Sequence, residues 1–117
     1  MPVTPWVYWG QSKTSTNVTR YTIAAVGALI TGIVSASSLG TAATITYTVI
    51  NAIVQKICDD CIPKVWYTDD VYYKYIQSPT HTNRVAELTY HAFYSDSNRT
   101  ANIGYSTSKV WLNGYVD

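Results

Sequence analysis

Residues 21–55 read YTIAAVGALITGIVSASSLGTAATITYTVINAIVQ and contain no Lys, Arg, Asp, Glu or His. All 8 basic and all 7 acidic residues of the 117-residue chain lie outside this stretch. The sequence SSLG at 37–40 interrupts it, so we expect one helix on each side of a turn. A segment this apolar forms the core of a small domain, enters a membrane, or is buried against other copies of the chain. The sequence leaves these three alternatives open.

The first helix is predicted over residues 18–37, as the first arm of an apolar helical hairpin at 21–58. Small side chains recur in this helix at a spacing of four, which places them in one row along its surface. This helix-packing ridge consists of Ala24, Ala28, Gly32 and Ala36. A ridge of small residues lets another backbone approach closely, as in packed membrane helices. We therefore expect the ridge to accept a partner.

The second helix is predicted over residues 41–58, where Ile or Val occupies positions 45, 49, 53 and 57. A spacing of four is typical of one helix face. The same stretch is rich in β-branched residues, which favour strands. Threonine alternates with other residues at 44–49, so a strand at 43–50 is the competing interpretation. We favour the helix because of the residues at spacing four.

The C-terminal half has the alternating pattern of strands. Strands are predicted at 65–67, 71–77, 84–94 and 102–112. Ser-Pro-Thr at 78–80 and Ser-Asp-Ser-Asn at 95–98 are turn sequences, so consecutive strands are expected to pair antiparallel. We assign this β-meander of three to four strands to residues 64–113.

Residues 1–20 are interpreted as an aromatic N-terminal arm, because Pro2, Pro5 and Gly10 discourage a helix. The length of the chain fits one domain with a modest core. The predicted fold is therefore a single α+β domain over residues 1–117. In it, the N-terminal apolar helical hairpin packs on the C-terminal antiparallel β-meander.

The composition narrows the range of partners. The net charge is +1 and no basic run occurs, so nucleic acid is not an expected partner. The chain has 11 Tyr and 4 Trp, whose rings suit half-exposed surfaces because each has an apolar body and a polar tip. The candidate aromatic interface consists of Trp6, Tyr8, Trp9, Tyr72, Tyr73 and Tyr75. It could meet lipid, sugar, cell wall or a protein partner. Ordinary packing between neighbouring strands is the alternative.

Cys58 and Cys61 enclose two aspartates and form the candidate disulfide. Free thiols, a redox site and half of a metal site are the alternatives. A metal site is not expected, because there is no second Cys pair and only His81 and His91 could complete it. A disulfide would place the protein outside the reducing cytosol, which favours secretion. Arg20 and the apolar residues after it have the layout of a signal peptide, but we interpret them as part of the mature protein.

The remaining polar residues do not predict catalysis. The acidic pairs at 59–60 and 69–70 are interpreted as solvated turn residues. His91 is interpreted as a structural histidine on a strand, since no motif places a Ser or Cys nucleophile beside it. The sequence has no phosphate-binding loop, dinucleotide fingerprint or zinc-protease motif. We therefore expect a protein that is not an enzyme and that uses no cofactor or metal.

An apolar hairpin followed by Tyr-rich strands, with YSDSNRTANIGY at 94–105, resembles small secreted proteins of Gram-positive bacteria. Some of those proteins are grouped with bacteriocins. The resemblance covers residues 21–113 and implies a secreted, bacteriocin-like protein. It transfers no functional residue to a specific position.

Two functions are therefore expected from the sequence. In the first, the protein is membrane-active and acts on lipid through its apolar hairpin. In the second, it is a self-assembling extracellular structural subunit, of a filament or surface layer, with the apolar segment buried between copies. Both predict a homo-oligomer.

Overall fold

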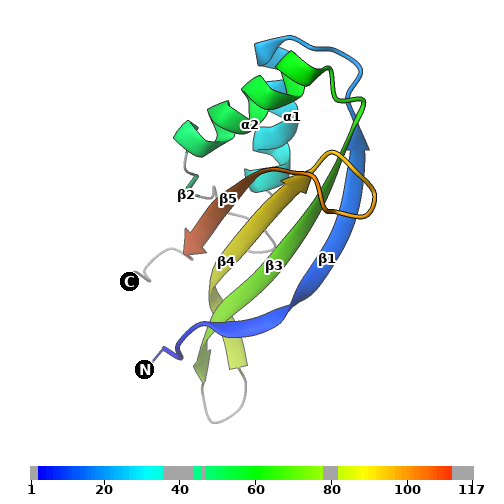
Figure 1. Cartoon of the computed structure of the whole chain (residues 1–117). Helices are drawn as coiled ribbons and strands as arrows, with labels where there is room; N and C mark the ends of the chain where they lie inside the picture. Colours follow the sequence, from blue (N-terminus) through cyan, green and yellow to red (C-terminus); the bar gives the residue numbers. More distant parts are fainter. Residues whose placement is uncertain (1–2, 36–43, 46, 78–81, 112–117) are drawn as a thin grey trace.

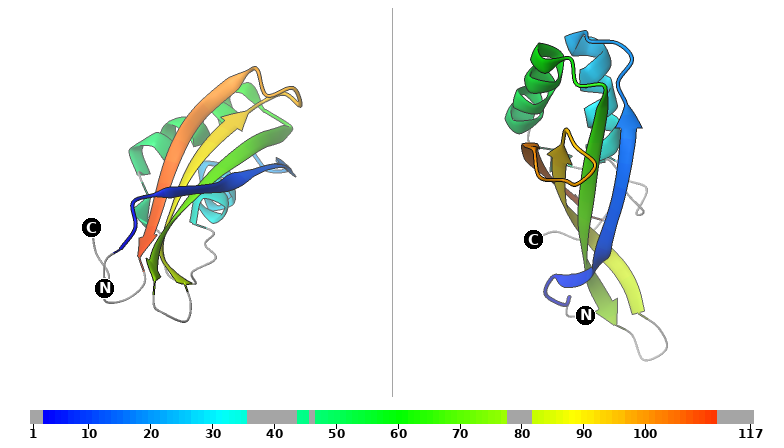
Figure 2. Two further views of the ribbon diagram at one scale, coloured as in Figure 1. Left: turned by 90° about the horizontal axis from the view of Figure 1, so that it is seen from below. Right: turned by 45° about the vertical axis from the view of Figure 1, so that its right-hand side comes forward.

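The computed structural model describes residues 3–35, 44–45, 47–77 and 82–111 of the chain. Its elements are β1 (Val7–Asn17), α1 (Ile23–Ser35), β2 (Thr44–Ile45), α2 (Tyr47–Asp60), β3 (Lys64–Gln77), β4 (Thr82–Tyr94) and β5 (Asn102–Trp111). The strands form one antiparallel sheet in the order β1-β3-β4-β5-β2. Both helices lie on the same side of the sheet, and β1, β3 and β4 extend beyond them (Figures 1 and 2). The predicted α+β class is confirmed.

The meander of β3, β4 and β5 is present, but β3 differs from its prediction. It is one continuous strand, whereas the sequence predicted two short strands separated by a polar turn at 68–70. Asp69 and Asp70 therefore lie inside the sheet and are not turn residues. Cross-strand partners explain the difference. His91 contacts Asp69, and Gln11 donates a hydrogen bond to Asp70. Both carboxylates therefore have polar partners while their backbone stays paired in the sheet.

The predicted N-terminal arm is largely a strand. β1 pairs with β3 along its whole length, from Val7 opposite Tyr73 to Asn17 opposite Lys64. A bulge at Trp9 interrupts the register. It is next to Gly10, which the sequence analysis considered only as a residue that discourages a helix. The segment was misassigned because its partner is far away in the sequence, so no local turn marks it as half of a hairpin.

Helix α1 begins later than predicted, and its predicted end at 37 lies outside the described residues. Thr22 caps it, since its Oγ1 accepts a hydrogen bond from the backbone N–H of Ala25 at 3.1 Å. Val26, Ile30 and Val34 recur at a spacing of four and are buried. They pack with the buried residues of α2, which include Ile53 and Ile57.

The segment between the helices carries a strand, so it is more than a turn. β2 pairs with β5, Thr44 opposite Lys109 and Ile45 opposite Ser108. The alternatives weighed for 43–50 both occur, a strand at Thr44–Ile45 and a helix from Tyr47. The predicted break at 37–40 and the ridge residue Ala36 lie outside the described residues.

Helix α2 ends in a left-handed turn at Cys61. The N–H of Ile62 donates to the carbonyl of Ile57 at 3.1 Å, and the N–H of Cys61 donates to the carbonyl of Cys58 at 3.4 Å. Cys61 has a φ of 48°, and Pro63 follows directly. These are the features of a Schellman cap, in which the left-handed position is most often glycine. Ile57 and Ile62, the two positions whose apolar side chains accompany such a cap, both belong to the core.

The cap also explains why the predicted disulfide is absent. Both cysteines are free thiols. The left-handed turn leaves the thiol of Cys61 exposed and 3.8 Å from the carbonyl oxygen of Cys58, with which it makes its one described polar contact. Cys58 itself packs against the core. The inference of a non-reducing compartment therefore loses its support from these residues.

Candidate functional site

The sheet has two faces with different surroundings. The helix face, beneath α1 and α2, includes Tyr67, Phe93 and Gly104, which lie opposite one another on β3, β4 and β5. The open face is the other side, and in the described part of the chain no helix covers it (Figure 2). Phe93 is fully buried and belongs to the cluster formed with the helices. The core therefore sits between the helices and one end of the sheet.

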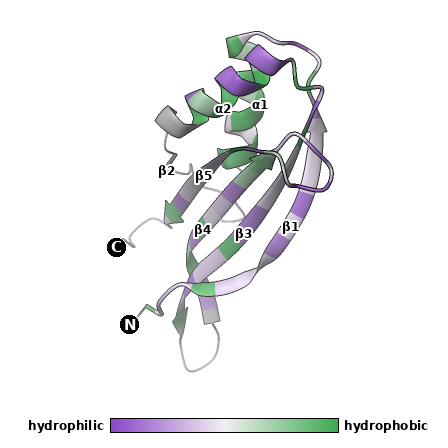
Figure 3. Cartoon of the chain, viewed as in Figure 1, coloured by the Kyte–Doolittle hydropathy of each residue, from purple (hydrophilic) through white to green (hydrophobic). Residues whose placement is uncertain are grey.

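The outward surface of α1 is uncharged. The helix has no Asp, Glu, Lys or Arg in any position. Ile23 is 56% exposed, and Ala24, Ala28 and Gly32 of the predicted ridge are exposed as well. The described chain thus leaves the ridge uncovered, and a Cβ added at Gly32 would meet no atom within 4 Å. The hydropathy colouring shows the contrast with α2, which carries hydrophilic residues (Figure 3).

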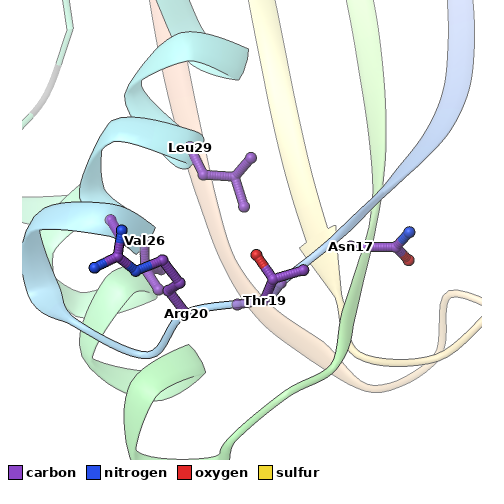
Figure 4. Close-up of a pocket in the computed structure, with 7 residues that line it drawn as sticks. Asn17, Thr19, Arg20, Val26 and Leu29 are labelled. Carbon is purple, nitrogen blue, oxygen red and sulfur yellow. The ribbon is translucent and has the colours of Figure 1, made fainter.

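A small hollow lies where α1 meets the end of β1. Its volume is ≈ 120 Å³, and it is lined by residues 17–20 together with Ala25, Val26 and Leu29. Leu29 points from α1 into the space above Thr19, while Arg20 lies on the other side (Figure 4). Leu29 is only half-buried. The hollow therefore lies beside the first turns of α1, where Val26 is buried and Leu29 is only partly covered.

The six residues of the predicted aromatic interface do not form one surface. On the open face, Tyr8 contacts Tyr72, with ring centroids 5.1 Å apart, and Tyr72 contacts Tyr90 at 5.6 Å. Trp6 lies 6.0 Å from Trp111 on the same face, above Lys74, which is two residues along β3 from Tyr72. Tyr90 and Trp111 do not belong to the predicted interface, because only the strand register shows that they meet its members.

The other three aromatic residues lie together elsewhere. Trp9, at the bulge of β1, contacts Tyr73, and Tyr73 contacts Tyr75. The guanidinium of Arg84 lies 4.2 Å from the centroid of Tyr73 and 6.0 Å from that of Trp9. Tyr73 is opposite Glu87 and on the helix face, so this cluster faces away from Tyr72. Half of the predicted interface is thus on each side of the sheet.

The open face has a cavity of ≈ 480 Å³. Its floor is a row of directly paired residues across four strands: Lys13, Thr68, Ala92 and Tyr105. Small side chains in the middle of the row and longer ones at its ends create the hollow. The adjacent row supplies Gln11, Asp70 and Tyr90 to the same cavity. Tyr90 and Tyr105 are 48% and 63% exposed.

Side chains around this cavity are held in place. Asp70 accepts hydrogen bonds from the amide of Gln11 at 3.0 Å and from the hydroxyl of Tyr8 at 3.2 Å. The pKa of Tyr8 is raised by partial desolvation and by its hydrogen bond to Asp70. These contacts connect β1 to β3 on the open face.

The loop between β4 and β5 closes one end of the cavity. Asp96 accepts hydrogen bonds from the N–H groups of Thr100 and Ala101 and from the hydroxyl of Thr100. These bonds lower the pKa of Asp96. Arg99 has a left-handed backbone conformation, with a φ of 56°. Its guanidinium donates a hydrogen bond to the carbonyl of Thr14 at 3.2 Å. The loop is thereby fixed to β1 across the sheet, and Arg99 lines the cavity.

A chain of three polar side chains crosses the helix face. Nδ1 of His91 lies 2.6 Å from Oδ1 of Asp69, and Nε2 lies 3.0 Å from Oγ of Ser108. His91 and Ser108 are 2% and 3% exposed. The order of groups is that of a Ser–His–Asp triad. Sequence analysis missed it because the three residues are on three different strands.

The polar chain lacks access for a substrate. Ser108 lines neither of the two cavities described above. An acyl substrate has to reach the serine oxygen and a set of oxyanion donors. Within the described residues we therefore assign these three side chains a structural role. His91 forms hydrogen bonds with one polar group on each of two neighbouring strands.

No family model, curated protein or solved structure matches the chain. In residues 3–35, 44–45, 47–77 and 82–111, no three of His, Cys, Asp and Glu come together as metal ligands. The same residues include no helix with the length and apolar character needed to cross a bilayer.

Proposed function

We propose that this chain is a secreted, membrane-active protein of the bacteriocin-like kind that its sequence resembles. The proposal assigns the contact with lipid to the apolar helices. The observation that supports it is the outward surface of α1, which is exposed and uncharged. A surface helix of a soluble domain normally carries charged or polar residues on that side. The surface of α1 therefore fits an environment other than water.

The dimensions of α1 favour a position in the membrane interface. Its 13 residues correspond to roughly 20 Å, against roughly 30 Å for the hydrocarbon core of a bilayer. Arg20 and Tyr21 precede the helix, and these residue types anchor helices at the level of the headgroups. In the proposed mode, α1 lies along the interface with Ile23 and Ala28 directed into lipid.

The attachment of the helices to the sheet is compatible with their movement. Both ends of the helical segment are held at one place, because the N–H of Val18 donates to the carbonyl of Pro63 at 2.9 Å. The hollow beside Leu29 leaves unfilled space between the start of α1 and the end of β1. We propose that the two helices act as the hairpin predicted from sequence and turn toward lipid as a unit, while the sheet stays intact.

A self-assembling structural subunit is the second candidate. The specific observation in its favour is the exposed ridge, since Ala24, Ala28 and Gly32 leave room for a second backbone. β1 also lies at the edge of the sheet and pairs only with β3 in the described chain. In this alternative, the ridge of one copy packs against an apolar helix of the next.

Vesicle binding distinguishes the two functions. Light scattering would first give the particle size in detergent-free buffer, with and without vesicles of anionic phospholipid holding a trapped dye. We compare the wild type with Ala28→Glu, which places a charge on the outward side of α1. Asn83→Glu is the matched control, because it makes the same charge change at an exposed position of β4, far from the helices. Far-UV circular dichroism would verify that both variants fold.

The membrane-active function predicts a protein that is monomeric in buffer, binds vesicles, and self-associates on the lipid to release the dye. Ala28→Glu should lose vesicle binding and dye release, and Asn83→Glu should keep both. A large regular particle that ignores vesicles would instead support the structural subunit, and Gly32→Leu should then disrupt it. A monomer that is indifferent to lipid contradicts both proposals.

A further inference from the structure

We infer that the cavity on the open face is a binding site for a carbohydrate chain bearing acidic groups. The site is on the opposite side of the sheet from the helices, so the inference does not depend on the membrane proposal. Its volume of ≈ 480 Å³ is within the usual range for small-ligand sites.

The shape of the cavity suits a flat ligand. The floor consists of the small side chains of Thr68 and Ala92. Tyr105 lies at one end of the same row, with most of its side chain exposed. The four strands of this row span roughly 14 Å, since neighbouring strands lie about 4.8 Å apart. A sugar ring presents a face of C–H groups that packs on an aromatic ring, and Tyr90 and Tyr105 offer such rings.

Fixed polar groups beside these rings match sugar hydroxyls. Asp70 and Gln11 hold each other in place, which leaves the second carboxylate oxygen of Asp70 available as an acceptor. Asn98 is exposed at the loop end of the cavity and offers both a donor and an acceptor. The Asp70 carboxylate and the Gln11 amide are already oriented, so they bind vicinal hydroxyls with little loss of side-chain entropy.

The charge of the lining favours an acidic ligand. Lys13 and Arg99 both line the cavity, and neither forms an ion pair within the described residues. The Nε atom of Arg99 is buried and has no hydrogen-bond partner there. Asp70 is the one carboxylate among the lining residues. An acidic group on the sugar, a carboxylate or a phosphate, would meet the positive charge at the Lys13 side of the floor.

Isothermal titration calorimetry tests the site with three probes: tetragalacturonate, neutral maltotetraose and inorganic phosphate. We expect tetragalacturonate to bind most tightly, and its affinity to fall with added salt. Lys13→Gln should weaken it about tenfold, as expected for loss of one charge-assisted contact. The matched control is Lys56→Gln, which removes the same charge from the exposed surface of α2 and should leave binding unchanged.

Two further variants separate the sugar from a bare anion. Ala92→Leu fills the floor, and Tyr105→Ala removes the most exposed ring, so each should abolish binding of tetragalacturonate while the fold persists. Phosphate binding as tight as that of tetragalacturonate would overturn the carbohydrate assignment. Equal binding of maltotetraose would overturn the acidic part. Absence of tetragalacturonate binding, or binding unaffected by Ala92→Leu, would overturn the site altogether.

Discussion

Gly104 of β5 lies directly beneath Ile53 of α2, and a Cβ atom at this glycine would be 2.6 Å from Cγ1 of Ile53. Ile53 is 1% exposed and belongs to the core. The missing side chain at Gly104 therefore sets how closely α2 approaches the sheet. Gly104 also lies opposite Phe93, the largest fully buried residue, so the contact is at the centre of the packing.

We predict that Gly104→Ala destabilises the fold by about 1–3 kcal/mol, because Ile53 or the helix has to shift. Gly32→Ala is the control: its Cβ meets no atom within 4 Å, and alanine favours the helix by up to about 1 kcal/mol. Urea unfolding followed by circular dichroism measures both. Equal effects of the two substitutions would show that α2 does not rest on β5 as described.

Replacing His91 should be costly. His91→Phe leaves Asp69 and Ser108 without their partner, and we expect a loss of about 2–4 kcal/mol in the free energy of unfolding. Ser108→Ala removes only the hydroxyl at the end of the chain and should cost about 1 kcal/mol. The measurement is chemical denaturation at neutral pH. An increase in stability for His91→Phe would mean that this polar chain does not support the sheet.

Replacing Cys61 by glycine should stabilise the protein. Cys61 has a left-handed backbone, with φ of 48°, which glycine adopts without the steric cost of a Cβ atom. We expect a gain of about 0.5–1 kcal/mol for Cys61→Gly and little change for Cys61→Ala, which keeps the Cβ. Thermal unfolding under reducing conditions checks this. A titration of two free thiols in the native protein would separately verify the state of the cysteines.

The loop between β4 and β5 should loosen in acid. The pKa of Asp96 is lowered by its hydrogen bonds from Thr100 and Ala101, so its carboxylate stabilises the loop above the ordinary pKa of 3.8. That contribution is lost as the pH falls through the lower pKa of the folded state. NMR spectra recorded from about pH 6 to 2 should show the amides of Thr100 and Ala101 shifting together. In Asp96→Asn we expect this acid transition to be absent, and its persistence would assign it to another group.

Local patterns predicted much of the fold. Apolar residues at a spacing of four located both helices, and alternation located β4 and β5. These signals depend on near neighbours in the sequence, and they survive in the folded state because each element buries one side. The ends were less accurate, since the cap at Thr22 and the left-handed turn at Cys61 are matters of backbone geometry.

Features that depend on distant pairing could not be predicted. The strand β1, the contact between His91 and Asp69, and the cavity above Thr68 and Ala92 all require the register between strands. The register also explains why the aromatic set divides, because Tyr72 and Tyr73 are neighbours in sequence and therefore point to opposite sides of β3. The composition indicated that tyrosines contribute to a half-exposed surface. It contained no information on which face of the sheet each tyrosine occupies.

The pairing of β1 with β3 also has a consequence for the order of folding. Asn17 and Lys64 are neighbours in the ladder although both helices lie between them in the chain. Pairing of β1 with β3 therefore closes a long loop that contains both helices, while β3, β4 and β5 follow one another directly and pair across short connections. We expect the meander to form first and β1 to be added last. During that interval the edge of β3 is open to any other extended strand, including the β1 of a neighbouring molecule.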